Sequence, residues 1–305
     1  MCAHNFALIC FRQSCRRYRV RPCRSQDKIQ MRYSSFSFFI GVTLTTGFVL
    51  VALLAPFIAP YSPYEQDFYN GLAGPGALHL LGQDSLGRDI LSRIIYGARV
   101  SLLVGFVTVF ISATVGVALG AVAGYFGGRI DEVIMRISDI FLSFPGILLA
   151  IAVMAVRGPG LENVIVALSI MGWTGYARLA RGQALSLRER EFVLAAEALG
   201  AGPLRIIFLH LLPNIAAPLI VEVTFGVASA IVGEAGLSFL GLGAQPPTAS
   251  WGSMLSEGRS FLLIAPHLTT FPGIAIMLVV MGINFLGDSL RTALDPKSKK
   301  VIRAV

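Results

Sequence analysis

Two glutamates stand in an otherwise uncharged, apolar stretch that runs from about Asn214 to Leu240. A carboxylate in hydrocarbon is costly unless it faces a wet cavity or has a polar partner. Glu222 could bind the ammonium group of a solute or pair with polar neighbours across helices, and Glu222 and Glu234 could both carry protons or ions. Asn284, in a later apolar stretch, could likewise bind a solute or pair with polar neighbours across helices. We therefore consider these three residues as a possible translocation path.

Other catalytic and metal-binding chemistry is poorly supported. Ser238, in Gly236-Leu-Ser238, could serve as a nucleophile with His267 as its base, but no orienting acid or oxyanion site accompanies the pair. Four dispersed histidines do not make a ligand set, and the four cysteines lack CxxC spacing. No GxxxxGK[ST] phosphate loop occurs. We expect no cofactor, no metal and no ATPase site in this chain, and hence no enzyme.

The composition is typical of a membrane protein. Of 305 residues, 55% are hydrophobic and 14% are charged. Charged residues make up about 25% of ordinary soluble domains, so this chain has too little charge for a water-soluble surface. The net charge is +8. Because the basic residues lie between long uncharged stretches, they favour orientation in a bilayer over binding of nucleic acid.

Six stretches approach the length of about 20 apolar residues that a membrane-spanning helix needs. The first is too long for the core of a signal peptide, so we expect an uncleaved anchor. The fourth is short unless the arginines in its last turn reach the interface. The predicted fold class is an all-α polytopic membrane protein with six transmembrane helices. The spans are Phe36–Ile58, Val100–Phe126, Val133–Val156, Asn163–Arg178, Asn214–Leu240 and Leu268–Leu286.

Positively charged residues concentrate in cytoplasmic loops and so predict the orientation. With the amino terminus inside, an even number of spans places both basic termini in the cytoplasm. Only five of the 25 Lys and Arg residues then fall outside, namely Arg88, Arg93, Arg99, Arg157 and Arg259.

The spans divide the chain into five parts. They are a basic cytoplasmic segment (1–33), a first transmembrane anchor (34–60), an extracytoplasmic segment (61–99), a five-helix core (100–290) and a basic cytoplasmic tail (291–305). Residues 1–30 differ in composition from the rest, so translation could start at Met31. All four cysteines lie in this first segment, on the reducing side, where disulfides are not expected.

Two segments outside the cytoplasm have recognisable patterns. Ile90, Leu91, Ile94 and Ile95 form one apolar stripe, which predicts an interfacial helix with an ion pair between Asp89 and Arg93. This helix could cap the bundle or dock a partner. The segment 233–252 is rich in Gly and Pro, which predicts a turn-rich surface or reentrant loop. Within the second span, Gly116, Gly120 and Gly124 repeat every fourth residue, which predicts close helix packing.

The cytoplasmic loop 185–213 predicts a helix-turn-helix. Phe192, Ala195, Ala196 and Leu199 recur at helical spacing, so a short amphipathic helix is expected over about 187–199. Gly200-Ala-Gly-Pro203 ends that helix and starts a second one that leads to Pro213. The loop could pack on its own bundle or dock a soluble subunit. DNA binding is disfavoured because the membrane tethers both ends of the loop.

Several long segments resemble one family. The chain is similar to inner-membrane permease subunits of bacterial dipeptide and oligopeptide ABC importers, with relatives for nickel and glutathione. The resemblance covers about residue 36 to Pro296 and implies the type I ABC importer permease fold in the bacterial inner membrane. Its strongest parts are His79–Asp89, Arg99–Gly105, Arg190–Asn214, Gly236–Gly243 with Trp251-Gly252, and Leu286–Arg291 ahead of Leu294-Asp-Pro296.

The resemblance also implies an ATPase-coupling motif in the cytoplasmic loop. The family pattern is Glu-Ala-Ala, three residues, Gly, and then a Leu-Pro ending. Leu194 stands where the pattern has Glu, and His210 stands where it often has Ile. Glu197 is one turn away, but not at the same position. The candidate coupling residues are Glu191, Ala195, Ala196, Glu197, Gly200, Leu212 and Pro213.

The implied partners are a second homologous permease, two ATPase subunits that use ATP, and an extracytoplasmic substrate-binding protein. Dipeptides are the first choice of substrate, followed by longer peptides and then by nickel chelates or glutathione. An ion-coupled secondary transporter without soluble partners is the alternative from another class, in which Glu222 and Glu234 would carry protons or ions.

Overall fold

The computed structural model describes residues 24–294, with side chains from residue 37 onward. Within this range the chain forms helices and no named strand. The predicted cytoplasmic segment before residue 24, with its four cysteines, and the tail after residue 294 lie outside the described residues. The helices are α1 (Arg24–Leu53), α2 (Ala55–Ile58), η1 (Phe68–Asn70), α3 (Ile90–Phe126), α4 (Gly128–Leu142), α5 (Gly146–Arg157), α6 (Leu161–Arg188), α7 (Glu191–Ala198), α8 (Pro203–Ile206), the π turn η2 (Ile207–Leu211), α9 (Leu212–Phe239), α10 (Trp251–Gly258), η3 (Arg259–Phe261) and α11 (His267–Leu294).

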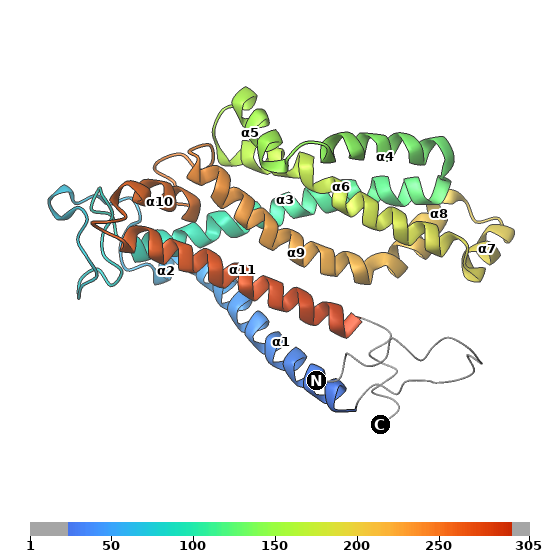
Figure 1. The fold of residues 1–305 in the computed structure, drawn as a ribbon, viewed down its shortest axis with the longest axis horizontal. Coiled ribbons are helices and arrows are strands. Elements are labelled where there is room, and N and C mark those ends of the chain that lie inside the picture. The colour runs from blue at the N-terminus through green and yellow to red at the C-terminus, as the bar shows by residue number, and fades with distance from the viewer. Residues whose placement is uncertain (1–23, 295–305) are drawn as a thin grey trace, which may run out of the picture.

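The helices form an elongated bundle (Figure 1). α3, α6 and α9 run along its middle, α4 and α5 lie on one side, and α1 and α11 lie on the other. We call the end with α10 and residues 59–89 the α10 end, and the opposite end, with α7 and α8, the α7 end. α3 has 37 residues and so spans about 55 Å, which exceeds the roughly 30 Å hydrocarbon core of a bilayer.

The six predicted spans correspond to helices in the structure. Among the described residues, three helices are long and apolar enough to cross a membrane: Ile90–Phe126, Pro203–Phe239 and His267–Leu294. A fourth candidate is the bent pair formed by α4 and α5. The apolar part of α1 is shorter (Ser37–Leu53), and α6 carries arginines in its second half. The arrangement is consistent with six spans.

The third predicted span is not one continuous helix. α4 and α5 meet at an angle of 87°, and the break contains Phe144 and Pro145. Proline lacks an amide hydrogen and disfavours helical geometry in the residue before it, so the helix ends there. The predicted third span over Val133–Val156 is therefore divided between two helices with a sharp bend.

The glycine repeat of α3 contacts the backbone of α6, as predicted. A Cβ atom on Gly116 would lie 2.3 Å from the carbonyl oxygen of Trp173, and one on Gly120 would lie 2.2 Å from that of Ala177. A Cβ on Gly124 would lie 2.6 Å from Cβ of Ala184. Only glycine allows this approach, so the two helices pack backbone to backbone.

The predicted interfacial helix is not a separate element, because residues 90–99 are the first turns of α3. The predicted ion pair between Asp89 and Arg93 is also wrong. Asp89 is the N-cap residue, and its carboxylate accepts a 2.8 Å hydrogen bond from the amide of Ser92 and lies 2.9 Å from His79 Nδ1. A capping residue lies outside the helix, so its side chain faces the free amides and not the side chain four residues later.

Arg93 belongs instead to a buried cluster of four charges at the α10 end. Its Nη1 contacts Asp84 and lies 2.8 Å from Glu257 Oε2 on α10. Arg88 joins the same two carboxylates, at 2.6 Å from Asp84 Oδ2 and 2.7 Å from Glu257 Oε2. Arg88, Arg93 and Asp84 are buried. Two positive and two negative charges thus balance where water is scarce, and the cluster fixes the loop before α3 to α10.

Candidate functional site

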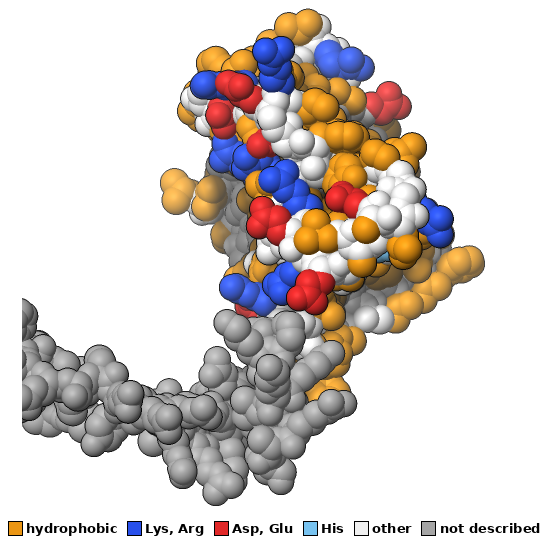
Figure 2. Space-filling model, turned by 90° about the vertical axis from the view of Figure 1, so that its right-hand side faces the viewer, with side chains coloured by type: hydrophobic (Ala, Val, Ile, Leu, Met, Phe, Trp, Pro, Cys, Tyr) orange, Lys and Arg blue, Asp and Glu red, His pale blue; other side chains and the backbone are white. Residues whose placement is uncertain are grey.

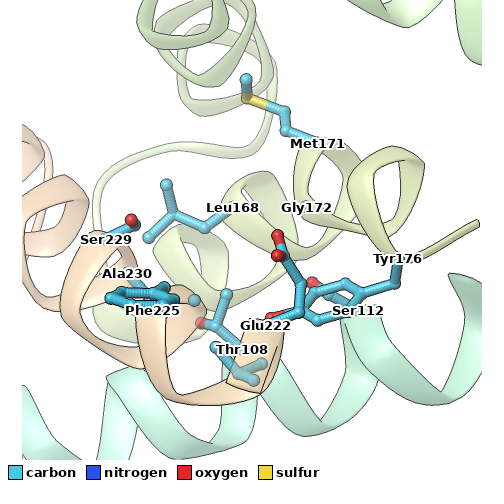
Figure 3. A pocket seen from close by; sticks show the side chains of 12 residues that line it. Thr108, Ser112, Leu168, Met171, Gly172, Tyr176, Glu222, Phe225, Ser229 and Ala230 are labelled. Atoms are coloured by element: carbon cyan, nitrogen blue, oxygen red, sulfur yellow. The ribbon is translucent and has the colours of Figure 1, made fainter. Parts of the chain in front are cut away.

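A cavity of about 310 Å³ opens between α3, α6 and α9 (Figure 3). Its walls are apolar with a few polar groups, which is typical of small-molecule sites. The lining residues are Thr108, Val109, Ser112, Leu168, Met171, Gly172, Tyr176, Glu222, Phe225, Gly226, Ser229 and Ala230.

Glu222 is the acidic residue of this cavity. It lies on α9 and is exposed in the single chain. Figure 3 shows its carboxylate reaching toward α6, above the ring of Tyr176. A Cβ on Gly175 of α6 would lie 4.0 Å from Glu222 Oε1. Within residues 37–294, Glu222 makes no hydrogen bond or ion pair with another side chain.

Two buried hydroxyl groups lie at the same cavity without a hydrogen-bond partner among the described residues. They belong to Thr108 of α3, which is 3% exposed, and Tyr176 of α6, which is 5% exposed. Gly226 makes room for the phenol, since a Cβ there would lie 2.0 Å from the Tyr176 oxygen. Sequence reasoning missed both residues. In the sequence, each is one hydroxyl-bearing residue within an apolar span, and such a residue is a weaker indication of a site than a charged residue is.

The other two predicted path residues do not line this cavity. Glu234 is fully buried further along α9 and accepts hydrogen bonds from Ser101 (3.0 Å) and Ser238 (2.7 Å). It joins α3, α9 and the loop after α9. Asn284 lies half-buried on α11. Only Glu222 of the three lines the cavity.

The segment 233–252 is partly helical, because α9 continues to Phe239 and the loop occupies only the residues before α10. Ser238 and His267 form no pair in the described structure. The Ser238 hydroxyl donates to Glu234 and accepts from the amide of Ala244, and His267 Nε2 lies 3.4 Å from the carbonyl of Gln83. A nucleophilic serine needs access to substrate, and Ser238 is buried and does not contact the predicted base His267.

The loop 185–213 folds as the predicted helix-turn-helix, with a later start. α6 continues to Arg188, so the short helix α7 begins at Glu191. Val193 on α7 is fully buried and packs with Ala121, Ala184 and Ile206 at the α7 end of α3, α6 and α8. One buried residue therefore anchors α7 to the bundle.

The predicted apolar stripe of α7 does not pack on its own bundle. Phe192 is 43% exposed and Leu199 is 89% exposed. Ala195 is exposed and Ala196 is partly exposed. Figure 2 shows this end of the molecule, where apolar and charged side chains of both signs are mixed on the surface.

The remaining predicted loop residues lie close to this stripe. Glu191 is exposed in the first turn of α7, where the helix dipole favours an acid. Glu197 accepts a 3.1 Å hydrogen bond from the Tyr125 hydroxyl of α3. Gly200 has φ of +81°, a conformation that favours glycine.

Leu212 and Pro213 lie where α8 joins α9. The five residues before Leu212 form a π turn. Proline removes a donor and crowds the carbonyl four residues earlier, so a locally widened helix accommodates Pro213 without a break. The segment Pro203–Phe239 therefore runs as one apolar helix from the loop into the bundle.

Two arginines of α6 pair with α4. Arg178 Nη2 lies 2.5 Å from Asp139 Oδ1, and Arg181 contacts Asp131. The predicted fourth span ended at the first of these arginines. α6 instead continues beyond Arg178 to Arg188, and both arginines have acidic partners on α4.

The family model described as the binding-protein-dependent transport system inner membrane component matches residues 116–300, more than half of the chain. The chain belongs to this family. A second model, the N-terminal TM domain of oligopeptide transport permease C, matches residues 37–75. The family consists of inner-membrane subunits of ABC importers, which work with an ATPase and a substrate-binding protein. The chain is therefore a multi-pass inner-membrane permease, as the resemblance implied.

Curated relatives match nearly the full length. The permease is 50% identical over 280 residues to the dipeptide transport system permease protein DppC of Alkalihalophilus pseudofirmus, which covers 92% of this chain and 91% of the relative. The DppC protein of Haemophilus influenzae is 43% identical, with 86% and 90% covered. The glutathione transport system permease protein GsiD of Escherichia coli O6:K15:H31 is 48% identical, with 82% and 83% covered.

The fold is similar to that of a solved ABC permease. A chain of the inward-facing MetNI methionine ABC transporter superposes with a TM-score of 0.56 and 21% sequence identity, covering 68% of this permease and 98% of the solved chain. This similarity supports the type I ABC importer permease fold that was predicted.

Proposed function

We propose that this permease forms one half of the translocation path of an ATP-driven importer of dipeptides or short oligopeptides. The observation that carries the proposal is the 50% identity to a dipeptide permease over 92% of the chain. The cavity between α3, α6 and α9, with Glu222 in its wall, is the proposed lining of the path.

The α7 helix is the proposed contact with the ATPase. Its exposed stripe of Phe192, Ala195, Ala196 and Leu199 lacks a partner within the described chain, while Val193 joins it firmly to α3 and α6. An exposed apolar stripe on a short anchored helix suits a docking groove on a soluble subunit. Movement of the ATPase would reach the spans through this helix.

The proposed assembly contains a second, homologous permease, two ATPase subunits and a binding protein. ATP is used by the ATPase subunits, and we propose that this chain has no nucleotide site or cofactor of its own. Both termini would be cytoplasmic, which agrees with the excess of positive residues at the α7 end. The α10 end would then receive the substrate from the binding protein.

Glutathione is the second candidate substrate, because the glutathione permease GsiD is 48% identical to this chain. A nickel chelate is a further alternative from the sequence. An ion-coupled secondary transporter is the alternative mechanism.

Uptake by a reconstituted complex tests the proposal. The permease, its partner permease, both ATPases and the binding protein are placed in liposomes, and uptake of labelled alanyl-alanine and of labelled glutathione is measured with and without ATP. ATP-dependent uptake of the dipeptide is expected. Uptake of glutathione alone would overturn the peptide assignment, and uptake driven by a pH gradient without the ATPases would overturn the mechanism.

A further inference from the structure

The charged side chain in the wall of this cavity is acidic. Glu222 is acidic, and no Lys, Arg or His is among the described residues that line the cavity. Within residues 37–294 no side chain neutralises or hydrogen-bonds the Glu222 carboxylate. A carboxylate at membrane depth without a cationic partner favours a positively charged group from outside the chain.

The polar groups around Glu222 are suited to accept hydrogen bonds. The hydroxyls of Thr108 and Tyr176 are buried, unpartnered and on two different helices. Ser112 and Ser229 add further hydroxyls to the wall. An ammonium group offers three donors and no acceptor, so a carboxylate with several hydroxyl oxygens matches it. A carboxylate ligand would be repelled by Glu222.

We infer that Glu222, together with the hydroxyls of Tyr176 and Thr108, forms a subsite for the free ammonium group of the transported solute, which is the amino terminus of a peptide. The inference rests on the proposed function, and it assigns a specificity role to this subunit in addition to that of the binding protein. It also predicts a preference for a neutral dipeptide over glutathione. Glutathione carries two carboxylates and one ammonium group, whereas a neutral dipeptide carries one of each, and Glu222 repels carboxylates.

Packing places the Tyr176 side chain at the wall of the cavity. Gly226 leaves the space that the Tyr176 hydroxyl occupies, so the phenol is held at the cavity by packing and needs no hydrogen bond to stay there. Figure 3 shows the aromatic ring of Tyr176 below the carboxylate of Glu222, on the side of α3. The face of an aromatic ring adds to the attraction of a cation.

The test compares Glu222→Gln with Glu132→Gln in the full reconstituted complex. Glu132 is an exposed carboxylate on α4 and serves as the matched control. With the binding protein saturated by alanyl-alanine, Glu222→Gln is expected to lower uptake about tenfold, the loss of one charge-assisted contact, while ATP hydrolysis stimulated by the binding protein is retained. Glu132→Gln is expected to change neither quantity.

Tyr176→Phe is a second test of the subsite, which remains informative if Glu222→Gln does not fold. It removes one unpartnered hydroxyl, so the subunit is expected to assemble normally, and uptake is expected to fall about threefold. Unchanged uptake in both Glu222→Gln and Tyr176→Phe would overturn the subsite. If the wild-type complex imports glutathione and no dipeptide, the peptide assignment fails by itself. In that case, uptake of glutathione by the same variants tests the subsite, since glutathione also carries an ammonium group.

Discussion

The indole Nε1 of Trp251 donates a 3.0 Å hydrogen bond to the backbone carbonyl of Ile94, which joins α10 to the first turns of α3. Trp251 is fully buried. A Cβ on Gly97 would lie 2.9 Å from its Cδ1 atom, and the ring of Phe48 on α1 meets the indole edge-on at 5.9 Å. Three helices therefore meet at one side chain at the α10 end.

Replacing Trp251 tests how much this contact stabilises the subunit. Trp251→Ala is expected to cost about 3–5 kcal/mol, because a large buried side chain leaves a cavity. Trp251→Phe keeps most of the apolar contact and is expected to cost less, with about 1 kcal/mol from the lost hydrogen bond. Thermal unfolding of the detergent-solubilised permease measures both. Equal unfolding temperatures for the two variants would contradict the assigned role of the ring.

Gly120→Val is expected to prevent the contact between α3 and α6. A Cβ at Gly120 would lie 2.2 Å from the carbonyl of Ala177, which cannot move without shifting the whole helix. Gly182→Ala on α6 is the control, since nothing lies within 4 Å of its Cβ position, and alanine favours a helix over glycine by up to about 1 kcal/mol. The yield of monodisperse protein should fall for Gly120→Val alone.

The four-charge cluster predicts coupling between Arg93 and Glu257. Arg93→Met and Glu257→Gln are each expected to destabilise the subunit, because each leaves buried charge without its partner. Since the two side chains contact one another, the double variant should lose less stability than the sum, with a coupling of about 0.5–3 kcal/mol. Thermal unfolding of all four proteins gives this value. Additive losses would show that the two residues act independently.

Leu199→Asp tests the docking face of α7. Leu199 is 89% exposed, so the change should leave the unfolding temperature of the isolated permease unaltered. It should weaken association with the ATPase and lower transport-coupled ATP hydrolysis, because a charge would enter an apolar interface. Leu263→Asp, at a residue 99% exposed on the α10 end, is the control. Pull-down of the ATPase by each variant measures this association. Retained binding by Leu199→Asp would exclude α7 as the contact.

The helices and their close packing could be read from the sequence because each depends on a local pattern. The spacing of Gly116, Gly120 and Gly124 predicted a helix face without side chains, and the structure places α6 on that face. Gly200 and Pro203 likewise marked the turn after α7, where φ of +81° favours glycine. The bend between α4 and α5 was also marked, by Pro145, but the apolar run across it suggested a continuous span.

The partners of charged residues could not be predicted, because they depend on contacts distant in sequence. Arg93 and Glu257 are separated by 164 positions, and the short-range rule pointed to Asp89 instead. The two glutamates of α9 looked alike in the sequence. Neighbouring helices distinguish them, since Ser101 of α3 satisfies Glu234, whereas Glu222 faces open space.

The backbone contact between α3 and α6 has a mechanical consequence. Helices this close have no side-chain layer that would let one slide past the other, so we expect α3 and α6 to move together. Val193 fixes α7 near one end of this pair, and Trp251 fixes α10 to the first turns of α3 at the other. A tilt imposed at the α7 end is therefore expected to reach the α10 end through α3.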